Sequence, residues 1–352
     1  MADAVSQAAE QDIRLQAAEL KRLGQAILEA VGTPVDLASI VAASLVDANL
    51  AGHDSHGVIR LPSYVASART GRVKPAARAQ VESLGDACMR VDGAWGWGQP
   101  AAHLATDTVA DLARANGVGL VTIGSCNHIG RLGEYIEKLT LTGQIGLMTC
   151  NSPPAVAPHG GYTRLLGTNP IAWGAPREPG KPPIVVDFAT ATIAEGKLRI
   201  AHAGGSMAPL GAVVDKHGRP SAETAAFYDG GALTTFGGHK GFGLSVMAEV
   251  MGGILSGTGS SSDPGFNNGN GTMLLAIDVS RFSRGFAFGQ HVDALVGRLH
   301  AAPRAPGFDE IVAPGEPEWR SRLRRTAEGI PVPAGTRRAI NDLAAELGLS
   351  PI

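Results

Sequence analysis

Residues 119–150 read GLVTIGSCNHIGRLGEYIEKLTLTGQIGLMTC, with a helical segment between two short apolar runs. The runs Gly119–Ile123 and Ile145–Cys150 are predicted strands, and Gly130–Thr142 is the predicted helix. A further helix is predicted over Pro100–Asn116, shortly before the first strand. This alternation of helices and strands indicates an α/β core.

The flanking segments extend this pattern in both directions. Towards the N-terminus, the apolar spacing predicts a helix that Gly32 ends, then a second helix with Thr33 as N-cap and Pro34 at its first position. A β-hairpin is predicted from Val81–Leu84 and Cys88–Val91. Towards the C-terminus we predict a loop over residues 151–170, a nearly all-apolar and therefore buried helix over Gly241–Ser256, and strands over Ile184–Phe188, Met273–Val279 and Ile311–Val312. The hairpin and the long loops argue against a simple doubly wound sheet.

Length, charge and cysteine spacing exclude several classes of protein. The chain has 352 residues, enough to bury a sizeable core, and its 30 basic and 32 acidic side chains give a net charge of −2. That balance leaves no basic footprint for nucleic acid or anionic lipid, and no apolar run reaches the roughly 20 residues that span a bilayer. No secretory signal opens the chain, and Cys88, Cys126 and Cys150 lie far apart. We expect a soluble, cytoplasmic protein without a nucleic-acid or membrane partner.

The common nucleotide-binding motifs are missing from the sequence. Neither G-x-G-x-x-G after a strand nor G-x-x-x-x-G-K-[ST] occurs, and the reversed spacing in Gly93-x-x-Gly96-x-Gly98 and Gly238-x-x-Gly241-x-Gly243 carries little weight. A Rossmann dinucleotide site is therefore disfavoured. Other anion-binding loops remain open as alternatives.

The densest polar cluster is GHDSHGVIR at residues 52–60, followed by Tyr64. Its groups suit the interconversion of an alcohol and a ketone beside a carboxylate. Arg60 offers a planar fork that matches a carboxylate, and His56 titrates near neutral pH and can exchange a proton. Ser55 can hydrogen-bond that imidazole if the chain turns here, which Gly52 and Gly57 favour.

Two other interpretations of this cluster stay open on the residues alone. In one, the cluster is a helix-capping loop whose His and Asp side chains bind backbone groups. In the other, His53, Asp54 and His56 ligate a metal, as in a metal-dependent hydrolase or lyase.

Several glycine-containing segments follow strands or begin helices, where backbone N–H groups can meet an anion. They are residues 127–133, with His128, Gly130 and Arg131; residues 160–170, with Thr168; Asp187 at a strand end; residues 237–241, with His239 and Lys240; and residues 314–318. Taken singly, each is also explained as a turn or a helix cap.

Eight segments in order resemble one known family. They are GHDSHGVIR (52–60), NHIG (127–130), PHGG (158–161), GTNPIA (167–172), DFAT (187–190), AEGK (194–197), GGHKGFG (237–243) and PGEP (314–317). The set resembles the type-2 malate/L-lactate dehydrogenase family, which includes ureidoglycolate, sulfolactate and 2,3-diketogulonate oxidoreductases and piperideine-2-carboxylate reductases. The resemblance covers residues 10 to 350, nearly the whole chain.

The resemblance implies a fold, a reaction and a set of roles. The fold would be α/β with a mixed sheet and no Rossmann site, and the chain would form one catalytic unit over residues 1–352, usually as a homodimer. Its two sublobes would be 10–85 with 280–352, which is helical and carries the active-site motif, and 86–279, which binds the cofactor. The reaction would be NAD- or NADP-dependent hydride exchange at C2 of a small 2-hydroxy or 2-oxo acid or a cyclic 2-imino acid.

The family's residue roles carry over to matching positions. Ser55 and His56 would be catalytic, and Arg60, Tyr64 and Thr168 would bind substrate. The cofactor would contact His128, Ile129, Gly130, Arg131, Leu132, Asp187, Phe188, Ala189, His239, Lys240, Gly315 and Glu316. The sequence departs from relatives at Ile129, Arg131 and Leu132, and Arg131 either favours the 2′-phosphate of NADP or faces solvent. A non-catalytic ligand-binding relative remains a third hypothesis.

Overall fold

The computed structural model describes residues 13–283 and 285–352; residues 1–12, at the start of the predicted catalytic unit, and residue 284 lie outside the described part. The chain divides into two compact units. One comprises the chain up to Ala76 together with Pro317–Ile352, and the other is Ala77–Glu316. That they act as one catalytic unit stays a prediction.

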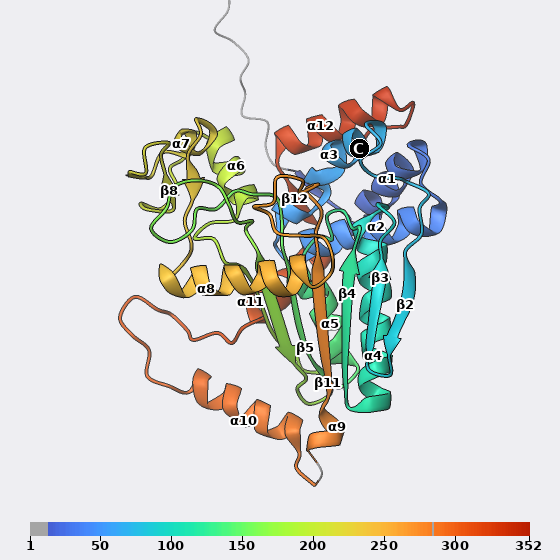
Figure 1. Cartoon of the computed structure of the whole chain (residues 1–352), viewed down its shortest axis with the longest axis vertical. Coiled ribbons are helices and arrows are strands. Elements are labelled where there is room, and N and C mark those ends of the chain that lie inside the picture. The colour runs from blue at the N-terminus through green and yellow to red at the C-terminus, as the bar shows by residue number, and fades with distance from the viewer. Residues whose placement is uncertain (1–12, 284) are drawn as a thin grey trace, which may run out of the picture. The chain divides into compact units, whose positions relative to one another are not determined.

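A seven-stranded mixed sheet organises the unit Ala77–Glu316 (Figure 1). The strand order is β2 (Gln80–Gly85), β3 (Cys88–Asp92), β4 (Val118–Gly124), β11 (Thr272–Asp278), β5 (Gln144–Cys150), β6 (Pro170–Ala175) and β7 (Ile184–Ala189). Only β3 and β4 pair in parallel; the other neighbours are antiparallel. The mixed α/β class and the β2–β3 hairpin are confirmed.

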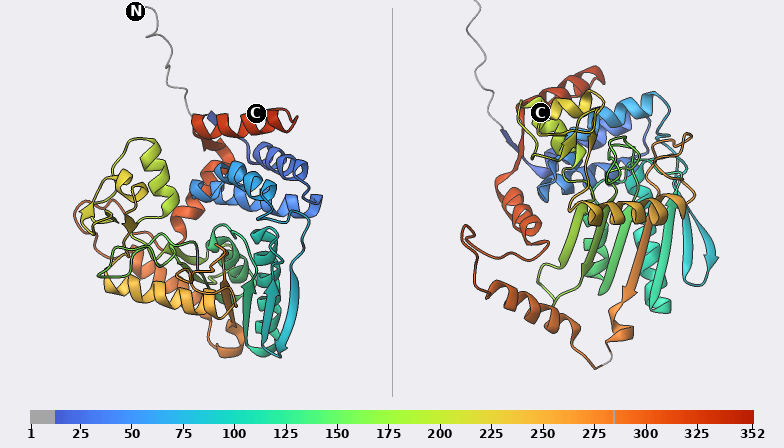
Figure 2. Two further views of the ribbon diagram at one scale, coloured as in Figure 1. Left: turned by 45° about the horizontal axis from the view of Figure 1, so that its top comes forward. Right: turned by 60° about the vertical axis from the view of Figure 1, so that its left-hand side comes forward.

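Helices α4 (Gly98–Asn116) and α5 (Leu132–Leu141) cover one face of this sheet (Figures 1 and 2). They approach closely because small residues form a row across four strands: Gly119, Ala276, Gly146 and Gly174 are register neighbours. A Cβ on Gly119 would lie 2.6 Å from Leu112 of α4, and one on Gly146 would lie 2.8 Å from Leu139 of α5. The glycines of the two predicted strands therefore set the helix-to-sheet distance.

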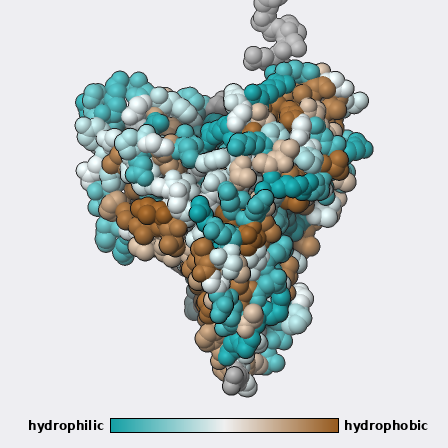
Figure 3. Space-filling view, turned by 45° about the vertical axis from the view of Figure 1, so that its right-hand side comes forward, coloured by the Kyte–Doolittle hydropathy of each residue, from teal (hydrophilic) through white to brown (hydrophobic). Residues whose placement is uncertain are grey.

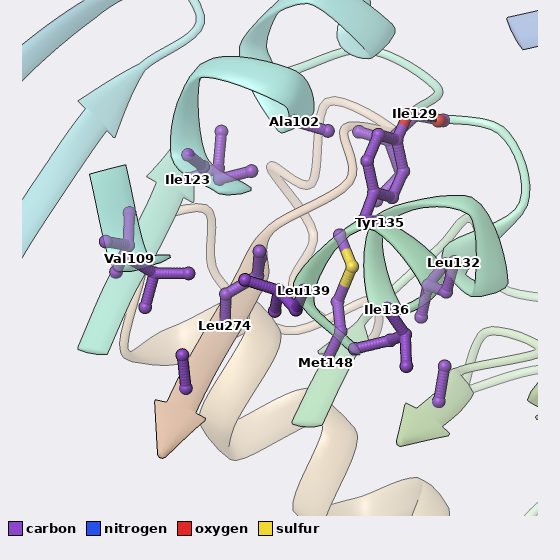
Figure 4. Packing of buried hydrophobic residues seen from close by; sticks show 14 of the residues in the cluster. Ala102, Val109, Ile123, Ile129, Leu132, Tyr135, Ile136, Leu139, Met148 and Leu274 are labelled. Atoms are coloured by element: carbon purple, nitrogen blue, oxygen red, sulfur yellow. Dashed lines mark hydrogen bonds between the residues drawn. The ribbon is translucent and has the colours of Figure 1, made fainter. Parts of the chain in front are cut away.

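The main core fills the layer between the sheet and these helices (Figure 4). Tyr135, Ile136 and Leu139 of α5 are fully buried against Met148 of β5. Ile123 and Leu274 continue the cluster towards α4. The Tyr135 hydroxyl donates a hydrogen bond to the Ile129 carbonyl, so the core also fixes the loop before α5.

Helix α8 (His239–Ala248) and the π-helical segment η3 (Glu249–Ile254) contact β5, β6 and β11 and cross the other face of the sheet (Figures 1 and 2). The prediction of a buried helix here is wrong. Its inner face holds small or polar residues, and a Cβ on Gly252 would lie 2.9 Å from the Cα of Cys150. Its large apolar side chains face outward instead: Val246, Met247, Val250 and Ile254 are 36–54% exposed.

The remaining elements of this unit are smaller. A three-stranded sheet joins β10 (Ala232–Leu233), β8 (Val213–Val214) and β9 (Pro220–Ser221), beside α6 (Glu195–Ala203) and α7 (Thr224–Tyr228). After β11 come α9 (Val279–Phe282) and α10 (Phe288–His300). The strand predicted over Ile311–Val312 is wrong, because these residues form no ladder; the Pro314 carbonyl instead accepts a hydrogen bond from Val185.

The other unit is mainly helical. It contains β1 (Ile13–Leu15), α1 (Ala17–Ala30), α2 (Val35–Leu50), the 3-10 turns η1 (Asp54–His56) and η2 (Val58–Arg60), α3 (Leu61–Arg69), β12 (Ile330–Val332), α12 (Ala334–Glu346), and α11 (Glu316–Glu328) from Pro317 onward. Gly32 follows α1 with φ +89, as expected for a helix end. The N-cap of α2 is Pro34 rather than Thr33, because the extended ψ of 144° at Pro34 delays the helix by one residue.

No helix within residues 13–283 and 285–352 is long and apolar enough to cross a membrane. On the face drawn in Figure 3, apolar residues are interspersed with hydrophilic ones.

Candidate active site

After α2, the GHDSHGVIR segment forms two consecutive 3-10 turns, which are η1 and η2. The expected turn brings Ser55 Oγ to 3.1 Å from His56 Nδ1, so these adjacent residues hydrogen-bond. Gly57 separates the turns, and a Cβ there would lie 2.2 Å from Asn49 Oδ1. That oxygen accepts a hydrogen bond from the Val58 N–H at 2.9 Å, so the close approach fixes the segment to α2.

Arg60 folds back onto the same turn. Its Nε donates to the Ser55 carbonyl at 2.7 Å, which orients the guanidinium relative to His56. Tyr64, one turn further on in α3, is 7% exposed and belongs to the buried set of this unit. The structure therefore gathers the Ser, the His and the Arg of the predicted site in one short segment.

The C-terminal helix α11 supports this segment with residues that sequence reasoning missed. Arg325 donates to both carboxylate oxygens of Asp54, at 2.6 and 3.0 Å, and Asn49 Nδ2 donates to Asp54 at 2.6 Å. His53 Nε2 lies 3.3 Å from Glu318 Oε1. The run of arginines in residues 320–325 is the one signal for this role, but nothing in the sequence pairs it with a residue 271 positions earlier.

These contacts bear on the metal-ligand interpretation. Asp54 and His53 are each bound to a residue of α11. Within the described residues, no three or more His, Cys, Asp or Glu side chains lie close enough to hold a metal ion. The geometry therefore gives the metal-dependent alternative no ligand set in this part of the chain.

In the other unit, the predicted cofactor segments meet around the edge strand β7. The Asp187 carboxylate accepts a hydrogen bond from the Gly133 N–H at 2.8 Å, at the start of α5. The rings of Phe188 and Phe236 pack edge to face with centroids 5.3 Å apart. The Val185 N–H donates to the Pro314 carbonyl at 3.2 Å. Three segments that are far apart in sequence thus contact a six-residue strand.

The loop before α5 presents mainly its backbone. Ile129 and Leu132 are 1% and 2% exposed because both side chains belong to the core, so only their main-chain atoms can contact a ligand. Gly130 has φ +83 and His128 is half-buried. Arg131 does not face solvent: its side chain is 2% exposed, and both terminal nitrogens donate to Glu137 at 3.1 Å.

The start of α8 is the second helix N-terminus near β7. Gly237 and Gly238 have φ +58 and +60, and His239 and Lys240 follow with exposed side chains. The ring of His159, from the PHGG segment, lies 6.2 Å from that of His239. This arrangement places two cationic or titratable side chains at the start of a helix, a setting that favours anions.

The remaining predicted residues are held more tightly. The Glu316 carboxylate accepts from the Ala313 N–H at 2.9 Å and from His300 at 3.0 Å, and a Cβ on Gly315 would lie 3.0 Å from the Val185 nitrogen. Ala189 ends β7 opposite Pro170. Thr168 donates its N–H to Ser152 Oγ at 3.0 Å, and its carbonyl accepts from the Thr190 N–H at 2.9 Å.

The comparisons with known proteins agree across almost the whole chain. The family described as malate/L-lactate dehydrogenase matches residues 15–341. A Δ1-pyrroline-2-carboxylate/Δ1-piperideine-2-carboxylate reductase of Pseudomonas syringae pv. tomato is 37% identical over 89% of this chain and 91% of its own. A malate dehydrogenase of Pyrococcus abyssi is 32% identical over 96% of both chains. The solved malate dehydrogenase of Pyrococcus horikoshii OT3 superposes with a TM-score of 0.89 and 30% identity, covering 97% of this chain and 98% of that one.

Proposed function

Because the chain belongs to the malate/L-lactate dehydrogenase family, we propose that it is an NAD(P)-dependent oxidoreductase of small 2-hydroxy or 2-oxo acids or cyclic 2-imino acids. That it is an oxidoreductase follows from the family itself. The cofactor, the substrate class and the residue roles are the proposal. The observation that carries it is the Ser55–His56 hydrogen bond, with Arg60 anchored to the same turn.

His56 is the proposed proton donor and acceptor. Ser55 Oγ occupies its Nδ1, so we assign proton exchange with the substrate to Nε2. Imidazole titrates near neutral pH, which allows it to give a proton to a ketone or imine, or to take one from an alcohol or amine. Ser55 holds the ring in one orientation and stabilises the tautomer that this exchange requires.

Arg60 is the proposed carboxylate anchor. Both an acyclic 2-oxo acid and a cyclic 2-imino acid carry a carboxylate next to the reacting carbon, and a guanidinium matches that group in two parallel hydrogen bonds. The Nε contact with the Ser55 carbonyl fixes the plane of the fork. Thr168 and Tyr64 are the other proposed substrate residues.

The residues around β7 fit a dinucleotide. Two helix N-termini, of α5 and α8, offer backbone N–H groups; Gly130, Gly237 and Gly238 bring that backbone close, and Lys240 adds charge. Asp187, Phe188, Ala189, His128, Ile129, Arg131, Leu132, His239, Gly315 and Glu316 complete the proposed set. A bound nicotinamide dinucleotide would supply the hydride chemistry. The buried Arg131–Glu137 pair removes the support for Arg131 as a 2′-phosphate reader and leaves NAD against NADP open to the assay.

A homodimer is the proposed assembly, as the family resemblance implies. The outward face of α8 and η3 supports it, because Val246, Met247, Val250 and Ile254 give an apolar surface of the composition typical of interface cores. Sedimentation equilibrium would test the assembly: we expect twice the mass of the chain, and a Val250→Glu variant should shift it to the monomer. The cytoplasmic location stays a prediction.

The test of function is oxidation of NADH and NADPH followed by absorbance, with pyruvate, oxaloacetate and Δ1-piperideine-2-carboxylate as substrates. We expect the dinucleotide to be oxidised in the presence of at least one of these acids, and not to be oxidised when no acid is added. The panel separates the oxo acids of the malate and lactate relatives from the imino acid of the reductase relative. Binding of the dinucleotide without turnover on any acid would favour the non-catalytic hypothesis instead.

A further inference from the structure

Glu249 is a buried carboxylate to which the proposed chemistry assigns no role. It opens the π-helical segment η3 and is 4% exposed. Its Oε1 accepts from Asn169 Nδ2 at 2.8 Å and from the Gly167 N–H at 3.2 Å. Its Oε2 accepts from the Ser261 N–H at 2.9 Å and from Asn151 Nδ2 at 3.1 Å. Because all four partners are N–H donors, the geometry suits an ionised carboxylate, which only accepts.

Two of these donors flank the proposed substrate residue Thr168. Asn169 is fully buried with φ +42, and its Nδ2 also reaches Ser245 Oγ at 3.0 Å. A Cβ on Gly167 would lie 2.3 Å from the Ser152 carbonyl oxygen, so no larger residue fits at this position of the loop. Glu249 therefore holds the residue before and the residue after Thr168, and the second of these, Asn169, is a non-glycine residue whose positive φ depends on that contact.

The other oxygen leads towards the proposed cofactor loop. Asn151, which donates to Oε2, accepts a hydrogen bond at its carbonyl from Asn270 Nδ2 at 2.8 Å. Asn270 Oδ1 in turn accepts from the Ile129 N–H at 3.3 Å. A continuous chain of buried hydrogen bonds thus joins the backbone of Ile129 to the backbone of Gly167 and the side chain of Asn169. Asn169 Oδ1 has no hydrogen-bond partner among the described residues, so its Nδ2 contacts, including the one with Glu249, are what orient this side chain.

We propose that Glu249 is a positioning residue for substrate: it fixes Thr168 in its binding orientation and keeps that loop in register with the cofactor loop at Ile129. This inference rests on the proposed function. It explains why a carboxylate lies in an otherwise small-residue helix face. A glutamine would place its NH2 group, itself a donor, against two of these N–H donors. An apolar side chain would remove the acceptor of the buried Gly167 and Ser261 N–H groups.

The test compares Glu249→Gln with Glu82→Gln, the same change at an exposed position of the same unit. With the acid that the substrate panel identifies, we expect Glu249→Gln to raise KM about tenfold or more while kcat falls less, since hydrogen bonds to a charged group are lost. Glu82→Gln should leave both constants unchanged. Thermal melting establishes that each variant is folded; should Glu249→Gln not fold, Asn169→Gly removes one donor while tolerating the positive φ, and the same rise in KM is expected.

A double variant separates positioning from a merely structural effect. If Glu249 acts through Thr168, adding Glu249→Gln to Thr168→Ala raises KM no further than Thr168→Ala alone. Additive effects, or an unchanged KM in the single variant, would overturn the inference. Amide exchange at Gly167 and Thr168 gives a readout that needs no turnover. It should accelerate in Glu249→Gln, and unchanged exchange overturns the inference even if the proposed function itself fails.

Discussion

The Asp187 carboxylate accepts a hydrogen bond from the Gly133 N–H at 2.8 Å, which joins the end of β7 to the first turn of α5. A negative charge at a helix N-terminus stabilises the helix and satisfies one of its unpaired N–H groups. The contact also sets the position of the loop at residues 127–131 relative to Phe188 and the start of α8. Asp187 therefore shapes the surface on which we place the dinucleotide.

Replacing Asp187 by Asn should weaken cofactor binding more than stability. The amide keeps the size of the side chain but loses the charge, and we expect the Kd for NADH or NADPH to rise about three- to tenfold. Quenching of nucleotide fluorescence in a titration measures it. Asp111→Asn, at a side chain 74% exposed on α4, is the matched control and should leave the Kd unchanged. An unaltered Kd in Asp187→Asn would remove this residue from the cofactor site.

His56→Ala should reduce kcat by about 10²- to 10⁴-fold, the usual contribution of a positioned acid or base. The matched control is His53→Ala, in the same segment and directly before η1. The His53 ring contacts Glu318. We expect that control to lower thermal stability slightly and to retain most of the turnover. Equal losses in the two variants would argue for a shared structural or ligating role and against His56 as the proton carrier.

Arg60→Lys should act mainly on KM. Lysine has no Nε donor for the Ser55 carbonyl and no planar fork, so a single point charge replaces two parallel hydrogen bonds. We expect KM for the acid to rise about tenfold or more, with a smaller change in kcat. Arg69→Lys, at the exposed end of α3 where Arg69 pairs with Glu346, provides the comparison. The same KM in both variants would be inconsistent with an anchoring role for Arg60.

Arg131→Met tests whether the buried guanidinium reads the cofactor. Because its side chain pairs with Glu137 and is 2% exposed, we expect the ratio of the KM values for NADH and NADPH to stay within about twofold of the wild-type ratio. The midpoint of thermal unfolding should fall, because the buried Arg131–Glu137 contact is lost. Steady-state kinetics with both dinucleotides, alongside a melting curve, measures the two effects. A tenfold change in that ratio would show that Arg131 contacts the 2′ position after all.

The sequence predicted most of the α/β framework because its signals are local. Short apolar runs identified β4, β5, β7 and β11, and apolar spacing identified α4 and α5. One failure has a clear physical cause. Gly241–Ser256 was expected to be buried because it is apolar, but in the structure its small residues face the sheet and its large ones face outward. A packing distance that only small residues permit cannot be inferred from hydrophobicity alone.

In the candidate site, too, contacts between sequence neighbours were predictable and contacts between distant residues were not. The Ser55–His56 contact was predictable because it spans one turn of chain. The partners that hold the site come from far away in sequence: Arg325 binds Asp54 across 271 positions, and Glu249 binds Asn169 across 80. Such pairs depend on the tertiary fold, and no spacing rule connects them. Arg131 illustrates the converse, since its neighbour Glu137 lies six residues away and still was not anticipated.

The three cysteines should differ sharply in reactivity, although the sequence treats them alike. Burial raises the pKa of Cys126 to about 12, with Asp92 adding to the effect, and burial with the nearby Asp187, Cys126 and Glu249 raises the pKa of Cys150 further. Because the thiolate is the reactive form, a pKa of about 12 leaves about one Cys126 in ten thousand ionised at pH 8. Cys88, on β3, is exposed.

A thiol-specific reagent such as Ellman's should therefore titrate one equivalent in the native protein at pH 8 and three in denaturant, and Cys88→Ser should abolish the native signal. Rapid labelling of Cys126 in the native state would instead show that the loop it precedes, residues 127–133, opens to solvent, which is incompatible with a preformed cofactor surface.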